Sequence, residues 1–448
     1  MSTASTLALR ARGPLTALDA ATRRIITDRT LTADPTVRNR TAAMIERVRQ
    51  EGDVALRAFA KEFDGVALGA IDVPRRYWQQ ALATLDADLA TALERAARNI
   101  TRVHSAFLPA TVEVSPEPGI VVGRRPDPLG RVGVYAPGGR AAYPSSLLMG
   151  AIPARVAGVG EIIVCSPPGP NGMPSQVVMA AAALANVDRL FAIGGAGAIA
   201  AMALGTDTVP PVDRIVGPGN AYVAEAKLQL VAHVAIDAPA GPSELLVLAD
   251  DSANPEAMAR ELLAQAEHDP DAAVVAVLVG VGTDVRATAV ELALDALLQN
   301  APRADIARAA MATRGAIVTV PTLADGVAFA NAWAAEHLLL ILSDDTRDGV
   351  LASLRNAGTV FVGESSSVAF GDYMTGANHV LPTAGAARCY SGLSTLDFVR
   401  WTTWQRVSPD AAASLADDVG RFADSEGLHG HAAAARAWSR SAAAGNAT

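Results

Sequence analysis

Short apolar runs that end in glycine or proline, each followed by a helical stretch, constrain this fold more than any other feature. Four such runs lie between residues 130 and 220: "RVGVYAPGG", "EIIVCSPPG", "RLFAIGGAG" and "RIVGPGN". Helical stretches such as "SSLLMGAIPARVAGV" and "SQVVMAAAALANV" separate them. Because a strand-then-helix order that repeats requires right-handed crossovers, it predicts a parallel sheet covered by helices.

The same order returns in the second half of the chain. Its apolar runs are "VAIDA", "ELLVLAD", "AAVVAVLVG", "GAIVTV", "HLLLILS" and "GTVFVG", most of them separated by helical stretches. The sequence therefore predicts an α/β fold with two parallel-sheet units.

The two ends of the chain carry mainly helical patterns. Apolar residues at helical spacing occupy the N-terminal region, and "LSTLDFVRWTTWQRV" with the polar stretch after it indicates a small C-terminal helical segment. We expect a helical N-terminal region that could pack on the second α/β unit. The expected domains are residues 1–129, 130–240, 241–385 and 386–448.

Composition excludes several classes of protein. Of the 448 residues, 50% are apolar and 19% are charged, which is typical of a chain with a large buried core. The net charge of −9 comes without a basic stripe, so we expect no nucleic-acid partner. The longest apolar run, residues 272–282, is too short to span a membrane, and we expect no membrane association. Two cysteines outside any CxxC pair predict a cytoplasmic protein.

Two glycine-rich turns are candidates for nucleotide binding. "GGAGAIA" (residues 194–200) places Gly195, Gly197 and Ala200 between a strand and a helix, where a backbone can approach a pyrophosphate. Tight packing of strand on helix explains the glycines equally well. The acid expected about 20 residues later would be Asp213, which lies in a turn. In "GPGN", Asn220 can reach a ligand through its amide.

The stretch "ELLAQAEHDP" is a candidate for half of a metal site. Gln265 and His268 lie three residues apart on a predicted helix and can converge on one point, whereas Glu267 points away from both. Polar residues that face water at a helix end are the simpler interpretation.

Other polar residues stand beside strands and glycines, where α/β proteins often bind ligands. Glu336 and His337 come just before a buried strand, and a capping role is the alternative for this pair. Asp372 and His379 lie in the glycine-rich loop "GDYMTGANHVLPT", where Asp372 could simply form a turn. The last group, described by "DSEGLHGH", contains Glu426, His429 and His431, and spacing does not rank the two histidines.

These stretches together resemble histidinol dehydrogenase, the zinc- and NAD-dependent last enzyme of histidine biosynthesis. The resemblance runs from about residue 20 to about residue 440. It is carried by "RVGVYAPGGRAAYPSS", "GPGNAYVAEAK", "IDAPAGPSELLVLAD", "LLAQAEHDP", "EHL", "GDYMTGANHVLPT" and "EGLHGH". The family implies two incomplete Rossmann-like units and a homodimer whose C-terminal segment reaches the partner subunit.

The resemblance also implies a role for each matching residue. The ligands of one zinc ion per subunit match Gln265, His268, Asp372 and His431, and these residues also contact the substrate. His337 matches the general base and Glu336 the activator of water. Substrate contacts further include Ser243, His337, His379 and Glu426. NAD contacts match Tyr135 and Asn220, and a third matches Gly197. Glu426 and His431 would complete the site of the neighbouring subunit.

The sequence departs from the family at three places. Gly197 stands where the family often has glutamine, which removes a side-chain contact with NAD. "GESSSVAFGDYMTG" differs from the family's commoner wording, and His429 adds an imidazole beside His431. None of these changes removes an expected zinc ligand or the Glu336–His337 pair.

Three other functions fit the same residues. The chain could oxidise another polar alcohol, such as a sulfonated diol, with zinc and NAD. It could also be a zinc hydrolase without NAD, because zinc, Glu and His serve hydrolysis too. A zinc-stabilised scaffold without activity would have no need of Glu336 and His337. We expect no cysteine nucleophile, since Cys165 lies far in sequence from every candidate site residue.

Overall fold

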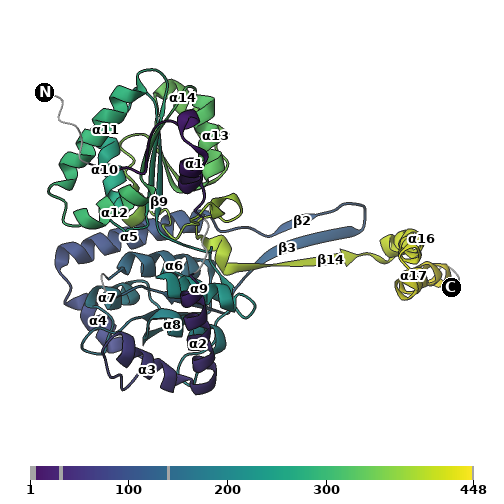
Figure 1. The fold of residues 1–448 in the computed structure, drawn as a ribbon. Helices are drawn as coiled ribbons and strands as arrows, with labels where there is room; N and C mark the ends of the chain where they lie inside the picture. The colour runs from purple at the N-terminus through teal and green to yellow at the C-terminus, as the bar shows by residue number, and fades with distance from the viewer. Residues whose placement is uncertain (1–6, 30–33, 139–141, 446–448) are drawn as a thin grey trace. The chain divides into compact units, whose positions relative to one another are not determined.

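Two parallel sheets with the same internal strand order form the framework of the chain (Figure 1). This computed structural model describes residues 7–29, 34–138 and 142–445. The first sheet has the order β6-β5-β4-β7-β8 and the second has the order β1-β11-β10-β9-β12-β13. In both, the first strand of the α/β unit lies between its second and fourth strands, which is the order of a Rossmann-like sheet. The predicted α/β class is confirmed.

The first sheet is formed by every strand that the sequence predicted between residues 130 and 240. These strands are β4 (Arg131–Tyr135), β5 (Glu161–Ser166), β6 (Arg189–Ala192), β7 (Arg214–Val216) and β8 (Ala235–Ile236). The helices are α6 (Pro144–Ala157), α7 (Gln176–Leu184), α8 (Gly195–Leu204) and α9 (Ala221–Leu230). Because helices cover both faces, the strands are buried on both sides, which explains their unbroken apolar runs.

The second sheet is formed by the later apolar runs and by β1, except that "VAIDA", which was expected among them, is β8 of the first sheet. Its strands are β1 (Ala11–Pro14), β9 (Glu244–Ala249), β10 (Ala273–Val279), β11 (Ala316–Val320), β12 (Ala335–Ile341) and β13 (Ala357–Val362). Its helices are α1 (Ala20–Thr27), α10 (Pro255–Ala266), α11 (Thr283–Leu298), α12 (Ala304–Arg314), α13 (Leu323–Trp333), α14 (Asp344–Ser353) and α15 (Val368–Tyr373). Side chains of α10, α11 and α12 pack in the core on one face of the sheet, and side chains of α1, α13 and α14 pack on the other.

The N-terminal region contributes to both sheets. It contains η1 (Leu15–Ala17), α2 (Pro35–Glu51), α3 (Asp53–Phe63), α4 (Arg75–Ala83) and α5 (Ala87–Ala106) besides β1 and α1. α2 packs against α8 and α9, whereas β1 pairs with β11. The expectation of helices alone misses β1, because the hydrogen bonds that make Ala11–Pro14 a strand come from β11, some 300 residues away in sequence.

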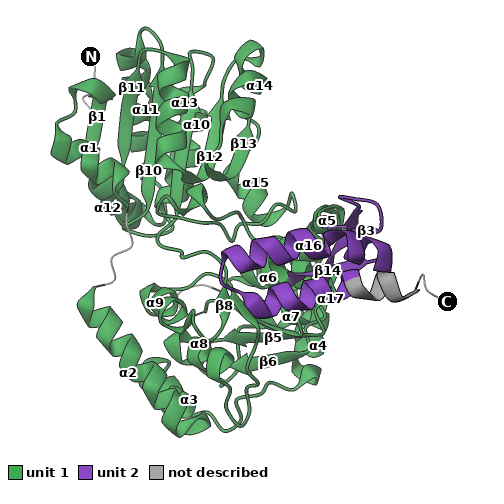
Figure 2. Cartoon of the chain, turned by 90° about the vertical axis from the view of Figure 1, so that its right-hand side faces the viewer, with its two compact units in different colours: residues 1–107, 129–398 green, residues 108–128, 399–448 purple. Residues whose placement is uncertain are grey.

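Residues 108–128 and 399–448 form a separate compact unit, unit 2 in Figure 2, and the rest of the chain is unit 1. Unit 2 contains β2 (Val112–Val114), β3 (Ile120–Pro128) and β14 (Val399–Val407) in an antiparallel sheet, followed by α16 (Pro409–Ser425) and α17 (His429–Gly445). The helical expectation for "LSTLDFVRWTTWQRV" is wrong for β14. Valine, threonine and tryptophan favour a strand, and β3 supplies the partner over nine residues. The part of unit 1 that precedes β14 contains η2 (Ala386–Arg388) and η3 (Thr395–Phe398).

One buried histidine, His104, makes no hydrogen bond through its ring among the described residues. His104 on α5 is buried, its ring meets Phe107 edge-on, and neither ring nitrogen has a hydrogen-bond partner among the described residues. Burial lowers the pKa of His104 from its ordinary value of 6.5 to about 4. We expect His104 to have a structural role, and its titration offers a test.

We predict that His104 contributes to the loss of stability in acid. The unfolded chain binds a proton on this imidazole below about pH 6.5, whereas the folded chain resists it down to about pH 4. The contribution of the neutral His104 ring to the free energy of unfolding is therefore complete above about pH 6.5. It is lost as the pH falls from about 6.5 to about 4. The His104→Leu variant should lose less thermal stability than the original chain between pH 7 and pH 4.5, by a few degrees. Parallel plots of melting temperature against pH for the two proteins would contradict this.

Candidate active site

The amino end of β12, in the second sheet, carries Glu336 and His337. The sequence suggested that these residues precede the strand. In the structure both lie inside β12, and both are buried. β12 runs parallel to β9 with His337 opposite Leu245. This register places the pair beside Glu244, the first residue of β9. A capping role for Glu336 and His337 is therefore wrong.

The peptide groups of Glu244 bind both members of the pair. Its N–H donates to Oε2 of Glu336 at 2.6 Å. Its carbonyl oxygen lies 3.1 Å from Nδ1 of His337, which donates to it. Nε2 of His337 has no hydrogen-bond partner among the described residues and points toward Asp372, with 3.4 Å to Oδ1. One ring nitrogen is thus fixed by the backbone and the other is available for chemistry.

Asp372 and His379 join the pair from another segment. Asp372 lies on α15, not in the loop expected from the sequence, and its carbonyl oxygen accepts a hydrogen bond from Nδ1 of His379 at 2.8 Å. Nε2 of His379 lies 3.3 Å from Oγ of Ser146, in the first turn of α6. This contact connects residues beside the second sheet to a helix that covers the first.

Electrostatics couples His337 to the carboxylates around it. Burial lowers the pKa of His337, but the charges of Glu336 and Asp372 outweigh this effect and raise it to about 10. Burial raises the pKa of Asp372, while the close approach and charge of His337 hold it below its usual value. The charges of His379 and His268 lower it further.

Gln265 and His268 lie at the carboxyl end of α10. Gln265 is 3% exposed, so its side-chain amide lies in the interior. His268 follows the end of the helix and is exposed, and its N–H donates to the carbonyl of Gln265 at 3.3 Å. The structure thus brings Gln265, His268 and Asp372 to one side of the second sheet. Among the described residues, no three His, Cys, Asp or Glu side chains form a metal-binding group by themselves.

The remaining predicted substrate residues divide between the two units. Ser243 precedes β9 and is half-buried. Glu426 ends α16 and His431 lies in the first turn of α17, and both are exposed within unit 2. His429, the extra imidazole, contacts Asp424 instead, with 3.0 Å between Nδ1 and Oδ1. Spacing did not separate the two histidines, whereas the structure gives His429 a partner of its own.

The predicted cofactor residues lie at the carboxyl end of the first sheet. Tyr135 ends β4, is buried, and accepts a hydrogen bond at its hydroxyl from the N–H of Gly195 at 3.1 Å. Burial raises its pKa to about 12. Asn220 caps α9 through Oδ1, which accepts from the N–H groups of Tyr222 and Val223 and leaves its amide donor free for a ligand. Residues 139–141 of the motif after β4 lie outside the described residues.

Two further residues of the nucleotide pattern are explained by packing. A Cβ atom on Gly197 would lie 2.9 Å from Cδ2 of Phe59 on α3, so the side-chain space at this position is already filled. Asp213 lies at the amino end of β7, where its carboxylate accepts from the N–H of Arg131 at 2.9 Å. It is therefore not at the sheet edge where a ribose would bind. A contact between NAD and the backbone of Gly197 stays a prediction.

A buried ion pair that sequence reasoning missed supports the "GPGN" turn. Lys227 on α9 donates to Oδ1 of Asp237 at 2.7 Å and to the carbonyl oxygen of Gly217 at 2.6 Å. The N–H of Gly217 donates in turn to Oδ2 of Asp237 at 2.8 Å. A Cβ atom on Gly217 would meet the backbone of Tyr135 at 2.2 Å, which requires glycine there. The available signal was a lysine and an aspartate within otherwise apolar runs.

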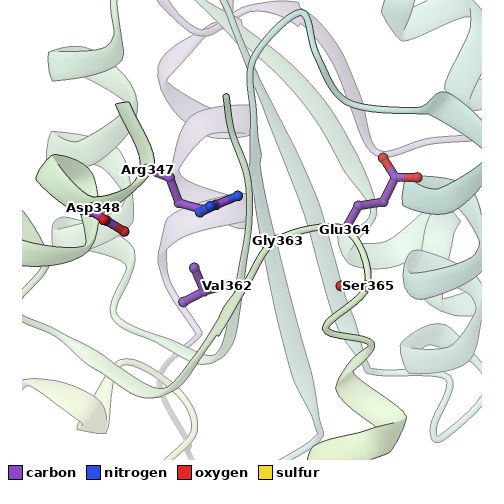
Figure 3. A pocket seen from close by; sticks show the side chains of 6 residues that line it. All are labelled: Arg347, Asp348, Val362, Gly363, Glu364 and Ser365. Atoms are coloured by element: carbon purple, nitrogen blue, oxygen red, sulfur yellow. The ribbon is translucent and has the colours of Figure 1, made fainter. Parts of the chain in front are cut away.

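A hollow in the described part of the chain lies elsewhere. It is at the carboxyl end of the second sheet, where Arg347 and Asp348 of α14 line one side and Glu364 and Ser365 the other (Figure 3). None of the predicted site residues lines this hollow. Shape alone therefore does not identify the candidate active site, which is defined by the convergence of its polar side chains.

The setting of Cys165 does not favour a nucleophile. This residue is fully buried in β5, and burial raises the pKa of its thiol, which disfavours the nucleophilic thiolate. In the described ranges, helices are too short or too polar to cross a membrane.

Known proteins resemble the chain over most of its length. A family model described as histidinol dehydrogenase matches residues 27–438. A histidinol dehydrogenase from Halobacterium salinarum is 49% identical over 400 residues, covering 89% of this chain and 92% of that protein. A histidinol dehydrogenase from Methanosarcina barkeri is 45% identical over 396 residues, covering 88% and 90%. A crystal structure of histidinol dehydrogenase from Elizabethkingia anophelis matches with a TM-score of 0.90 and 33% identity, covering 97% of this chain and 99% of that one.

We predict that Lys227 stabilises the first sheet through its charge. The Lys227→Met variant leaves the buried carboxylate of Asp237 without a partner and should lower the free energy of unfolding by about 3–5 kcal/mol. The double variant Lys227→Met/Asp237→Leu removes both charges and should recover much of this loss. Denaturant unfolding of the three proteins makes the comparison. A double variant that is no more stable than the single variant would argue against the ion pair.

Proposed function

Because the chain belongs to the histidinol dehydrogenase family, we propose that it oxidises L-histidinol to L-histidine through L-histidinal, the last step of histidine biosynthesis. The observation that carries this proposal is the family match across residues 27–438. Two successive hydride transfers to NAD complete the oxidation. The scarcity of cysteines, two in 448 residues, supports a cytoplasmic location.

The residues of unit 1 fit a zinc ion in part. The buried amide of Gln265, the imidazole of His268 and the carboxylate of Asp372 offer the nitrogen and oxygen ligands that zinc accepts. His431 is the proposed fourth ligand. Bound zinc would polarise the amino alcohol as a Lewis acid and would offset the Asp372 charge that raises the pKa of His337.

His337 and Glu336 carry the proton transfers in this proposal. Nε2 of His337 accepts the proton of the substrate hydroxyl as hydride leaves the adjacent carbon, because Nδ1 is already committed to the carbonyl of Glu244. In the second step the aldehyde reacts as its hydrate. Glu336, held through Oε2 by the N–H of Glu244, orients and deprotonates the water that forms this hydrate.

The substrate and cofactor are held by residues of both sheets. Ser243 and His379 contact the substrate, together with the zinc ligands. NAD binds at the carboxyl end of the first sheet, where Tyr135, Asn220 and the backbone of Gly197 lie. The link from His379 to Ser146 on α6 supports a substrate site between this edge and the amino end of β12.

A second copy of the chain completes the site in this proposal. Glu426 and His431 of unit 2 are exposed within their own unit. The helices that carry them also expose large apolar side chains, with Phe422 71% and Trp438 51% exposed. Apolar surface of this kind favours burial against a partner. The proposed assembly is a homodimer in which each C-terminal segment supplies Glu426 and His431 to its neighbour.

We predict zinc-dependent formation of NADH from L-histidinol and NAD. Zinc-loaded protein should produce about two NADH for each histidinol, one for each hydride transfer, with histidine as the product. Protein stripped with a chelator should be inactive and should recover when zinc is restored. NADH is followed by absorbance and histidine by chromatography.

The same assay separates the alternatives. The Gln265→Ala variant should bind less zinc, measured by elemental analysis, while its fold remains intact by circular dichroism. Zinc binding without NADH from histidinol would contradict the proposed substrate. NADH from a sulfonated diol alone would identify a different alcohol dehydrogenase, and hydrolysis without a response to NAD would identify a hydrolase.

If the C-terminal segments are exchanged between the two subunits, two variants that are inactive alone should restore activity when they form a mixed dimer. In a dimer of His268→Ala with His431→Ala, one site carries both defects and the other carries none. Random assembly on co-expression should therefore give about a quarter of the original activity. The control pairs His268→Ala with Asp372→Asn, both in unit 1, and should stay inactive. Equal inactivity of the two mixtures would contradict the exchange.

A further inference from the structure

We infer that the buried ion pair between Arg29 and Glu244 is a positioning device for Glu336 and His337. This inference rests on the catalytic roles proposed for those two residues. Neither Arg29 nor Glu244 belongs to the residues assigned above to zinc, NAD or substrate. Their role follows from two sets of contacts. The backbone N–H and carbonyl of Glu244 bind Glu336 and His337, and Arg29 holds the side chain of Glu244.

The main chain of Glu244 is the only part of the described chain seen to bind both catalytic side chains through backbone groups. Its N–H holds Oε2 of Glu336 at 2.6 Å, and its carbonyl oxygen holds Nδ1 of His337 at 3.1 Å. Glu244 is the first residue of β9, so its N–H lies at the very start of the parallel ladder. A rotation of this backbone would therefore move Glu336 and His337 together.

The side chain of Glu244 fixes that backbone from the opposite direction. Oε2 is paired with Nη1 of Arg29, and Oε1 accepts a hydrogen bond from the N–H of Ala384 at 2.8 Å. Burial raises the pKa of the Glu244 carboxyl to about 7, and the positive charge of Arg29 acts against this rise. Arg29 therefore favours the ionised carboxylate that accepts from Ala384.

Arg29 is itself held tightly. It is buried, its Nη2 donates to the carbonyl oxygen of Trp333, and its guanidinium lies 3.6 Å from the centre of the Trp333 ring. Nε1 of Trp333 donates to the carbonyl oxygen of Ile26 at 3.0 Å. A continuous set of contacts thus runs from the end of α1, through Trp333 and Arg29, to the start of β9.

A purely stabilising role would not require charge at this place. A buried ion pair contributes little net stability, and apolar residues of similar volume often serve as well. Removing only the arginine is different, because an uncompensated carboxylate must then take up a proton or move toward water. Either response alters the side chain that anchors the Glu244 backbone, and a shift of about 1 Å in a catalytic group can cost about 100-fold in rate.

The first test is the Arg29→Met variant of the zinc-loaded, full-length protein. We expect kcat for histidinol to fall at least about tenfold while KM and bound zinc change little, since the loss concerns proton transfer and not binding. The second readout is the NMR signal of the His337 Nδ1 proton in protein labelled with ¹⁵N-histidine, assigned by its loss in His337→Asn. This proton should be protected from exchange in the original chain and unprotected in Arg29→Met.

The matched control is Arg155→Met. Arg155 also forms a partly buried ion pair, with 2.6 Å to Asp188, but Asp188 lies at the amino end of the first sheet, where it binds the N–H of Ile162. This variant should lose stability and keep both kcat and the His337 signal. If Arg29→Met does not fold, Glu244→Gln removes the same ion pair and is measured in the same way.

Rescue separates charge from packing. The double variant Arg29→Met/Glu244→Gln has no buried charge, and its amide oxygen still accepts from Ala384, so we expect kcat within about threefold of the original and a restored His337 signal. A protected His337 signal in Arg29→Met would overturn the inference. Loss of the signal in both the single and the double variant would overturn it too, because packing around Arg29 would then be the cause. If the original chain does not oxidise histidinol, the proposed function fails, while the NMR comparison still tests the positioning.

Discussion

The parallel pairing of β9 with β12 is the interaction on which the candidate active site depends. The register that sets His337 opposite Leu245 also sets the backbone of Glu244 beside the proposed catalytic pair, Glu336 and His337. Strands buried on both faces cannot slide without breaking ladder hydrogen bonds and core packing together. A rigid sheet thus fixes two polar side chains in an apolar interior, where their hydrogen bonds are strong and their charges are weakly screened.

The candidate residues lie at opposite strand ends in the two sheets. Tyr135 and the "GPGN" turn lie at the carboxyl end of the first sheet, the usual ligand-binding edge of such a fold. Glu336 and His337 lie at the amino end of β12 in the second sheet. At the carboxyl end of this sheet, Asp250 after β9 accepts a hydrogen bond from the N–H of Ser343 after β12 at 2.8 Å. The contact of His379 with Ser146 shows how one chain joins these two different edges.

Sequence patterns predicted the strands of both sheets because each is a short apolar run that ends at glycine, proline or a polar residue. They failed where the deciding contact was distant. β1 became a strand through β11, and β14 through β3. Glu336 and His337 were placed before a strand because buried polar residues interrupt an apolar pattern. Glu244 and Arg29 drew no prediction, since an ion pair between segments far apart in sequence has no local signal. Lys227 and Asp237 lie only ten residues apart, and their charges within apolar runs were a signal that drew no prediction.

The sequence by itself determined the α/β class and the approximate positions of most strands of both sheets, because periodicity and turn residues act over a few neighbours. Its motifs also identified the family and therefore the candidate residues. Only the tertiary structure decided that Phe59 fills the space beside Gly197, that Asp213 lies at the wrong edge for a ribose, and that one backbone holds Glu336 and His337 together. These facts depend on strand register and on packing between distant segments, and neither is written in the spacing of residues along the chain.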